Sequence, residues 1–508
     1  MKKNILEFLE NSAKKYPDKV AFKDENKAVT YFDLIKKSKQ IGSEIAKSGN
    51  KNSPYLVYIE KSVECIEAML GIVYSGNFYV VIDVEMPHDR LKNICETLCP
   101  VGAVTVKSQE LPDTVTALSE LYFCDEEYET DDDKLKLIRN GMIDTDPLYA
   151  LFTSGSTGVP KGAVVTHKNV ISYTDWVCNT FGITEETVYG SQAPFYFSMS
   201  VTDVFSTLKS GGTLVILPKK LFIFPVKLLE YMAENYVNTI YWVPSALGIV
   251  ANWRALDFAD VPTLKKIMFA GETIPVKQLN VWKKHFPNAL FANLFGPTET
   301  TDICTYYVVD RDFNDDESLP IGKHCNNCDV FVLTEDGRKA ECNEEGELYA
   351  RGSFIIPGYY NNPEKTASAF VQNPLNKSYP EIVYRTGDIV KYNENGELIY
   401  IGRKDFQIKH MGYRIELGEI ETAAGSVENV KSVCCVYDSE KSKIVLCYEG
   451  ERISSADVEA AVKQKVPVYM VPDVIFRITS MPHNANGKID RKYILANYKQ
   501  LKKLTKEK

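Results

Sequence analysis

Apolar and polar positions alternate between helix-like and strand-like spacing through the first part of the chain. Over residues 33–48, apolar side chains recur on one helical face, with lysines elsewhere. Residues 55–59 and 79–82 are short β-rich runs, and residues 66–74 between them have a helical pattern. Alternation of this kind predicts a mostly parallel sheet covered by helices.

The pattern changes along the chain. A second alternating block covers residues 147–310. From about 318 to 400, glycine and asparagine turns separate short strands, which predicts a small β-barrel or antiparallel sheet. The last hundred residues mix strands with helices. We therefore expect an α/β protein: a large N-terminal region of mostly parallel α/β layers with a β-rich subdomain, followed by a small α+β domain.

The composition of the chain narrows the class of protein. The 508 residues carry 59 basic and 68 acidic side chains, a formal charge of −9, and 44% are hydrophobic. These values are typical of a soluble globular protein and do not favour a nucleic-acid binder. No apolar run reaches the roughly 18 residues of a membrane span. The twelve cysteines form no paired zinc pattern, so we expect reduced cysteines in a cytoplasmic protein, with a metal or redox site as the alternative.

The strongest local motif is the stretch 151–163, Leu-Phe-Thr-Ser-Gly-Ser-Thr-Gly-Val-Pro-Lys-Gly-Ala. Its glycines let the backbone wrap an anion, its hydroxyls donate hydrogen bonds, and its lysine supplies positive charge. It differs from the usual P-loop, and a flexible Gly/Ser loop is the alternative. The residues assigned to phosphate binding are Thr153, Ser154, Gly155, Ser156, Thr157, Gly158 and Lys161.

Five motifs in order resemble those of the adenylate-forming superfamily, which includes acyl-CoA synthetases, luciferase-like enzymes and amino-acid adenylation domains. Nearest in appearance are stand-alone amino-acid adenylation enzymes of the nonribosomal peptide type and D-alanine–carrier-protein ligases. The motifs lie at residues 151–163, 293–300, 384–388, 402–416 and 486–491.

The second and third motifs predict the nucleotide site. Phe295 can stack on a purine, and the Glu299 carboxylate can hold Mg²⁺ against phosphate oxygens. Asp388, expected at a tight turn after Gly387, can grip the ribose hydroxyls. The alternatives are a core phenylalanine and a turn-capping aspartate. The remaining residues assigned to ATP or AMP are Asn293, Gly296, Thr298 and Arg403, the last having a surface ion pair as its alternative.

The last two motifs imply a moving domain. In the family that the chain resembles, the lysine matching Lys488 contacts the substrate carboxylate and the α-phosphate, which makes it the catalytic residue. Asp405 matches the hinge. The resemblance implies an N-terminal core at residues 1–402, with the β-rich subdomain at about 318–400, and a mobile lid domain at residues 403–508.

The substrate-binding positions depart from the family pattern. Ser198 stands where α-amino-acid enzymes usually carry the aspartate that pairs with the substrate ammonium, and a hydroxyl cannot neutralise a buried charge. Asp302 either holds an amine or a phenolic hydroxyl, or is an exposed loop residue. Trp242 would fill much of the pocket. The other expected pocket residues are Met199, Thr202, Met268, Ala270, Leu294 and Ile303.

The resemblance implies ATP-dependent activation of a small carboxylic acid, with an amino acid favoured, to an acyl-AMP. The acyl group then passes to the phosphopantetheine thiol of a separate carrier protein, because no carrier motif follows Lys488. A β-amino acid or a hydroxylated aryl acid is an alternative substrate, and coenzyme A is an alternative acceptor. From another class, an idle nucleotide-binding scaffold is the remaining hypothesis.

Overall fold

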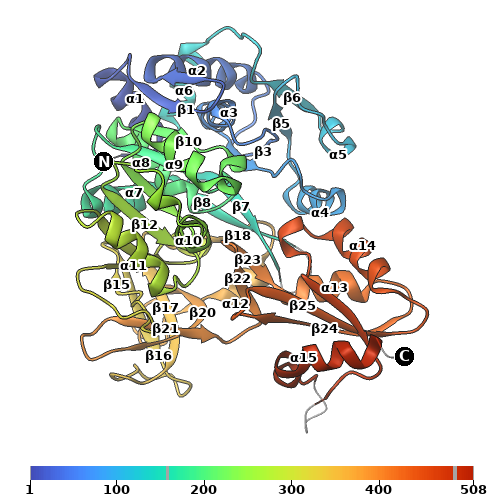
Figure 1. The fold of residues 1–508 in the computed structure, drawn as a ribbon. Coiled ribbons are helices and arrows are strands. Elements are labelled where there is room, and N and C mark those ends of the chain that lie inside the picture. Colours follow the sequence, from blue (N-terminus) through green and yellow to red (C-terminus); the bar gives the residue numbers. More distant parts are fainter. Residues whose placement is uncertain (1, 156–159, 484–488, 507–508) are drawn as a thin grey trace. The chain divides into compact units, whose positions relative to one another are not determined.

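The computed structural model describes residues 2–155, 160–483 and 489–506 (Figure 1). The chain divides into two compact units. The first contains residues 1–84, 98–151 and 162–404, and the second contains residues 85–97, 152–161 and 405–508. The break in the C-terminal half therefore falls between Lys404 and Asp405.

The first unit contains a sheet whose inner strands are all parallel. Its nine strands, counted within the described residues, are in spatial order β15 (Lys323–His324), β14 (Thr305–Val308), β13 (Leu290–Phe295), β12 (Lys266–Ala270), β11 (Thr239–Trp242), β9 (Val188–Ser191), β10 (Thr213–Ile216), β1 (Val20–Lys23) and β2 (Ala28–Thr30). Pairing is parallel from β13 to β1 and antiparallel at both ends. The carboxyl ends of neighbouring strands therefore meet at one edge, where α/β proteins place their ligands.

A second sheet has the order β18 (Gly358–Tyr359), β8 (Lys161–Thr166), β7 (Pro147–Thr153), β4 (Phe78–Val81), β3 (Pro54–Val57), β5 (Gly102–Thr105) and β6 (Glu120–Phe123). Its strands from β7 to β6 pair in parallel. Strand β3 is buried along its whole length, as its continuous apolar sequence requires.

The helices of this part of the chain form where apolar periodicity meets a cap. The predicted helix over 33–48 is confirmed as α2, whose N-cap Thr30 accepts a hydrogen bond from the Asp33 amide. The helices are α1 (Leu6–Lys15), α2 (Tyr31–Ala46), α3 (Val63–Tyr74), α4 (His88–Leu98), α5 (Asp113–Thr116), α6 (Asp132–Asn140), α7 (His167–Phe181), α8 (Ser200–Ser210), α9 (Pro225–Glu234), α10 (Pro244–Asn252), α11 (Val276–His285) and α12 (Pro363–Ala369). Of these, α4 groups with the second unit up to Thr97.

The predicted β-rich subdomain is an antiparallel sheet. It contains β16 (Cys328–Leu333), β17 (Gly346–Gly352), β20 (Ile382–Tyr392), β19 (Phe370–Gln372) and β21 (Leu398–Arg403). All its pairings are antiparallel, and β20 is irregular in register against both β17 and β21.

The second unit has two small sheets, and Figure 1 draws its C-terminal residues in orange and red. Strands β22 (Gln407–His410) and β23 (Tyr413–Glu416) form a hairpin. Strands β24 (Val430–Asp438), β25 (Lys443–Gly450) and β26 (Val474–Ile478) form the other sheet. Alternate residues of β24 and β25 pack on opposite faces, one with α13 (Leu417–Gly425) and α14 (Ser455–Lys465), the other with α15 (Arg491–Lys506).

The expected fold class, α/β with a β-rich subdomain and an α+β C-terminal domain, is confirmed. In the described part of the chain, no helix has the length and apolarity needed to cross a membrane.

Candidate active site

The glycine-rich loop connects β7 to β8. Thr153 ends β7 and Lys161 begins β8. Ser154 is buried; its hydroxyl donates to the Arg414 carbonyl at 2.8 Å and accepts from the Glu416 amide at 3.2 Å. The hydroxyl of Thr153 is buried without a hydrogen-bond partner among the described residues. Ser156, Thr157 and Gly158 lie outside the described residues, so their assignment to phosphate stays a prediction, as does that of Gly155.

The second motif follows β13 into a short 3-10 helix, Thr298–Thr300. Glu299 is fully buried and accepts a hydrogen bond from the Tyr359 hydroxyl at 2.6 Å. That bond fixes one carboxylate oxygen, which is the support a metal-ligating carboxylate needs. The Asn293 amide donates to the Pro320 carbonyl at 2.8 Å, and the Phe295 ring lies 5.7 Å from that of Tyr400.

Gly296 allows a close backbone approach beside this motif. A Cβ added to Gly296 would lie 2.5 Å from the Ile303 Cα atom, closer than real side chains allow. The nucleotide motif is therefore packed directly against the backbone that carries Asp302 and Ile303.

The third motif brings Asp388 and Arg403 together. They face each other across β20 and β21, and Arg403 donates to Asp388 Oδ1 at 2.8 Å with both side chains buried. The expected tight turn at Gly387 is wrong: Gly387 lies inside β20, with a φ of 76° where the register against β17 shifts. A bulge, which glycine accommodates, takes the place of the turn. Because both side chains are buried, Arg403 does not form the surface ion pair that was its alternative explanation.

The predicted catalytic lysine of the last motif, Lys488, lies outside the described residues. Asp405 is the first residue of the second unit's C-terminal segment, and its Oδ1 accepts a hydrogen bond from the Gln407 amide at 3.2 Å. The roles of both residues stay predictions.

Asp302 is the centre of a buried polar cluster, which we call the Asp302 cluster. Its Oδ2 accepts from the hydroxyls of Tyr173 on α7 at 2.9 Å, Tyr241 on β11 at 3.0 Å and Thr202 on α8 at 3.2 Å. Ser198 lies close enough to lower the pKa of the carboxyl as well. Burial raises the pKa of Asp302 to about 6, although these four hydroxyls lower it. With 2% of its surface exposed, Asp302 is not an exposed loop residue.

The other expected substrate-binding residues lie on strands β11, β12 and β13, at the start of α8, or just before β14. All are buried, and Ala270 and Leu294 are register partners on β12 and β13. Trp242, which ends β11, donates its indole N–H to the Gly190 carbonyl at 2.8 Å and packs edge-on against Phe222 and Trp282. The remaining members are Met199, Thr202, Met268 and Ile303.

Sequence reasoning missed a second buried group nearby. Asp203, next to Thr202 on α8, is fully buried, and its carboxylate lacks a hydrogen-bond partner within the described residues. Lys61 donates to the backbone and side-chain oxygens of Ser191 at 2.9 and 3.1 Å. Burial raises the pKa of Asp203 and lowers that of Lys61, and their mutual attraction offsets part of each shift.

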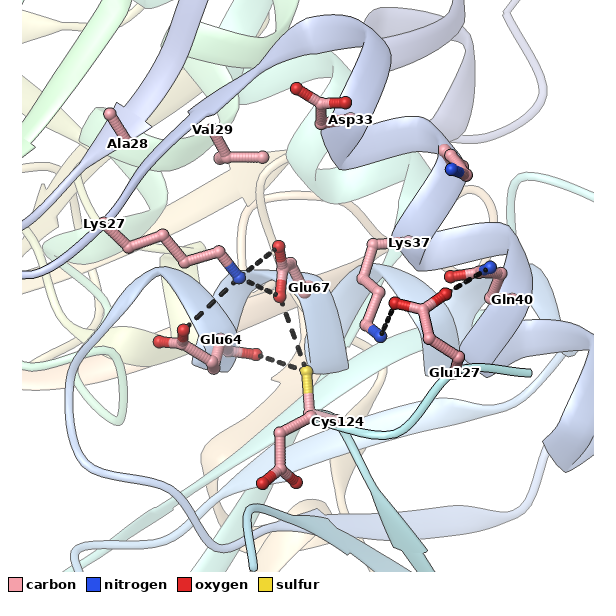
Figure 2. Close-up of a pocket in the computed structure, with 12 residues that line it drawn as sticks. Lys27, Ala28, Val29, Asp33, Lys37, Gln40, Glu64, Glu67, Cys124 and Glu127 are labelled. Carbon is pink, nitrogen blue, oxygen red and sulfur yellow. Dashed lines mark hydrogen bonds and ion pairs between the residues drawn. The ribbon is translucent and has the colours of Figure 1, made fainter.

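A cavity of about 410 Å³ lies elsewhere in the first unit and contains none of the predicted site residues (Figure 2). Lys27 reaches both oxygens of Glu67 at 2.8 Å and Glu64 at 3.3 Å. Lys37 and Gln40 hold Glu127. These pairs leave Glu64, Glu67 and Glu127 each beside a cation, and the cavity lies apart from the sequence motifs, so we assign it no part in the chemistry.

Comparisons with known proteins agree with the order of these motifs. The family described as AMP-binding enzyme matches residues 9–360. The D-alanine–D-alanyl carrier protein ligase of Lacticaseibacillus casei (strain BL23) is 31% identical over 508 residues, covering 97% of this chain and 99% of that protein. Tyrocidine synthase 1 of Brevibacillus parabrevis is 32% identical over 496 residues, but the chain spans only 44% of its length.

Solved structures share the fold. The Vibrio cholerae adenylation domain AlmE, in complex with glycyl-adenosine-5′-phosphate, superposes with a TM-score of 0.85 at 21% identity, covering 98% of both chains. The artificially fused adenylation–PCP di-domain NpsA-ThdA from Klebsiella oxytoca has a TM-score of 0.78 at 20% identity, covering 94% of both chains.

The chain belongs to the AMP-binding enzyme family. It is an adenylate-forming ligase, related over nearly its whole length to ligases that serve a carrier protein.

Proposed function

We propose that the enzyme activates a small carboxylic acid with ATP and transfers the acyl group to the phosphopantetheine thiol of a separate carrier protein. The observation that carries this proposal is the full-length match to D-alanine–D-alanyl carrier protein ligases, in which both chains are covered almost completely. An amino acid is the favoured substrate.

The first half-reaction joins the acid to AMP. A carboxylate oxygen of the substrate attacks the α-phosphorus of ATP, the bond to the β-phosphate breaks, and pyrophosphate leaves. Lys488 is proposed to place positive charge between the two anionic reactants, where it lowers the barrier most. Asp388, held by Arg403, is proposed to accept hydrogen bonds from the ribose hydroxyls.

The residues present fit Mg²⁺. Glu299 offers a hard carboxylate oxygen donor that Tyr359 orients, and the described residues hold no group of three or more side chains able to ligate a metal. Mg²⁺ is commonly bound by one or two carboxylates together with substrate phosphates, which matches this donor set. When bound, the ion would neutralise phosphate charge.

In the second half-reaction, the thiol sulfur attacks the acyl carbon, AMP leaves, and a thioester forms. Asp405 is proposed as the hinge that takes Lys488 away between the two steps, since a few residues at the end of an element can absorb a domain rotation. Asp405→Pro should therefore impair thioester formation more than adenylation.

Pyrophosphate exchange tests the first step. We expect exchange with at least one acid from a panel of amino, β-amino, aryl and short fatty acids, and a severe loss in Lys488→Gln. Near-normal exchange in that variant would contradict the role of Lys488, and no exchange with any acid would favour the scaffold hypothesis. Mass spectrometry then separates transfer to a phosphopantetheinylated carrier from transfer to coenzyme A.

A further inference from the structure

The Asp302 carboxylate is buried, and among the described residues no cation pairs with it. Its Oδ2 accepts from three hydroxyls, all of them neutral donors. None of the ion pairs formed by the described residues includes Asp302. An ionised carboxylate in a water-poor site is costly unless a cation accompanies it.

We propose that Asp302 is the receptor for the substrate's ammonium group, so that the acid is an amino acid held by its amine at Asp302 instead of at position 198. The inference rests on the proposed function, because it places the acid of the adenylation step at these residues.

The charges around the cluster favour a cation over a phenol. The hydroxyls of Tyr173, Tyr241 and Thr202 already donate to the carboxylate, so a phenolic hydroxyl would add a fourth neutral donor and leave the negative charge uncompensated. An ammonium group supplies donors and the missing charge together.

The neighbouring buried carboxylate strengthens this preference. Asp203 lies within electrostatic reach of Asp302, and the charge on each disfavours ionisation of the other. Lys61 is the cation that attracts Asp203. Lys61 therefore compensates Asp203, whereas no cation among the described residues compensates Asp302, and an amino-acid substrate would bring one.

The three anchoring hydroxyls also make the receptor rigid. They come from α7, α8 and β11, which are separate elements of the first unit, and they hold the same oxygen. Ser198, the residue that replaces the usual amine-binding aspartate, lies close enough to lower the pKa of this carboxyl. The negative charge absent at position 198 is thus present at a carboxylate near Ser198.

The test is pyrophosphate exchange of the full-length wild-type protein with matched acids. The matched sets are D-alanine, L-alanine and β-alanine against propionate and lactate, 3-aminobutyrate against butyrate, and 3-(aminomethyl)benzoate, whose amine is protonated at neutral pH, against 3-hydroxybenzoate and benzoate. We expect an amino acid to exceed its amine-free counterparts in kcat/KM by about 100-fold or more. This comparison needs no variant, so misfolding cannot obscure it.

Asp302→Asn keeps the shape of the side chain and removes its charge. We expect it to lower kcat/KM for the amino acid by about 100-fold or more while the KM for ATP changes little. Glu67→Gln, which alters an equally buried carboxylate in the cavity of Figure 2, is the matched control and should leave discrimination intact. Calorimetry with a nonhydrolysable aminoacyl-sulfamoyl adenosine and its amine-free analogue gives the same comparison without turnover.

Each unfavourable outcome has a separate meaning. Exchange with hydroxylated or amine-free acids that equals exchange with amino acids would overturn the amine assignment and leave the proposed function in place. Amine-selective exchange that survives Asp302→Asn would overturn the role of Asp302. No exchange with any acid would overturn the proposed function itself.

Discussion

Two carboxylates in this protein are buried to the same extent and compensated in opposite ways. Glu67 and Asp302 are each 2% exposed. Both oxygens of Glu67 accept from Lys27 at 2.8 Å, whereas Asp302 Oδ2 accepts from three uncharged hydroxyls. The charge of Glu67 is therefore compensated within the protein. The charge of Asp302 is not neutralised by any cation among the described residues.

The difference shows that burial of an acid does not by itself mark a binding site. Burial raises the pKa of both carboxyls. Burial alone would lower the pKa of Lys27, yet hydrogen bonds and charge from Glu67 and Glu64 raise it, which reports a favourable pair. What distinguishes Asp302 is the absence of such a partner, and four substitutions test whether this difference is real.

The largest expected effect comes from making Glu67 resemble Asp302. Lys27→Met leaves Glu67 buried without its cation, and breaking such a pair typically costs 3–5 kcal/mol. Because the Lys27 side chain is 35% exposed, we expect about 3 kcal/mol of lost unfolding free energy, the low end of that range. Urea denaturation measures it, and the double variant Lys27→Met/Glu67→Gln should recover part of the loss. An unchanged urea midpoint in Lys27→Met would show that Glu67 does not depend on its cation, and the two carboxylates would then not differ in this respect.

Asp302→Asn should raise the free energy of unfolding in the absence of substrate, the opposite of the effect of Lys27→Met. The folded pKa of Asp302, about 6, lies above its ordinary value of 3.8. The folded state therefore binds the proton more tightly, and ionisation costs stability that is lost as pH rises from about 4 to 6. Removing the charge should stabilise the protein by about 3 kcal/mol at pH 8.

Denaturation of wild type and Asp302→Asn at several pH values checks the sign. The stabilisation should shrink below pH 6 and vanish near pH 4, because the wild-type carboxyl is then protonated as well. Because the charge of Asp302 raises the pKa of Asp203, removing that charge also eases ionisation of Asp203, which adds to the stabilisation with the same sign. A variant that is less stable than wild type at pH 8 would show that the charge is compensated after all.

A smaller effect is expected from removing one anchoring hydroxyl. Tyr241→Phe takes a donor from Asp302 Oδ2 and should raise the pKa of Asp302 by about one unit, or about 1.4 kcal/mol. Since only the ionised carboxylate binds an ammonium group, kcat/KM for the amino acid should rise through pH 6 in wild type and through about pH 7 in the variant.

The other titratable groups facing Asp302 are Asp203, Tyr149, Tyr173 and Cys325. Burial raises the pKa of Tyr149, Tyr173 and Cys325 well above this range. Tyr241 donates to Asp302 and not to Asp203, so a movement of the limb in Tyr241→Phe identifies Asp302. Tyr55→Phe, which removes a hydroxyl from the carboxylate of Glu120, is the control. If both profiles coincide with wild type, the limb belongs to another group.

The smallest effect is expected at Glu64, which contacts the same cation as Glu67 from a more exposed position. Its carboxylate lies 3.3 Å from Lys27 and its side chain is 27% exposed. Exposed pairs typically contribute less than about 1 kcal/mol, so Glu64→Gln should destabilise the protein by about 0.5 kcal/mol. A thermal melt compares it with Lys27→Met, and equal losses would show that exposure does not govern these pairs.

Much of the architecture follows from local pattern. The helix at 33–48, the parallel α/β layers and the β-rich subdomain were all predictable because periodicity and turn residues act over short distances. The expected turn at Gly387 was wrong because a shift in strand register, which depends on the partner strands, decided the backbone there.

The chemistry of the Asp302 cluster was only partly predictable. The sequence pointed to Ser198 and Asp302 as the unusual positions. It gave no sign of Tyr173 and Tyr241, which lie 129 and 61 residues from Asp302 and meet it only through the packing of α7 and β11. From the sequence pattern, a buried tyrosine in a helix or strand is predicted to be a core residue. The role of its hydroxyl depends on tertiary contacts, which periodicity does not predict.

The close approach at Gly296 constrains how such an enzyme can diversify. Because the backbone at Ile303 leaves no room for a side chain at position 296, insertions or deletions between 296 and 303 would displace the nucleotide motif together with the substrate residues. Changes of side chain at 302 and 303 carry no such penalty. A change in acid preference, whether by selection or in the laboratory, should therefore keep the length of this loop and exchange individual side chains.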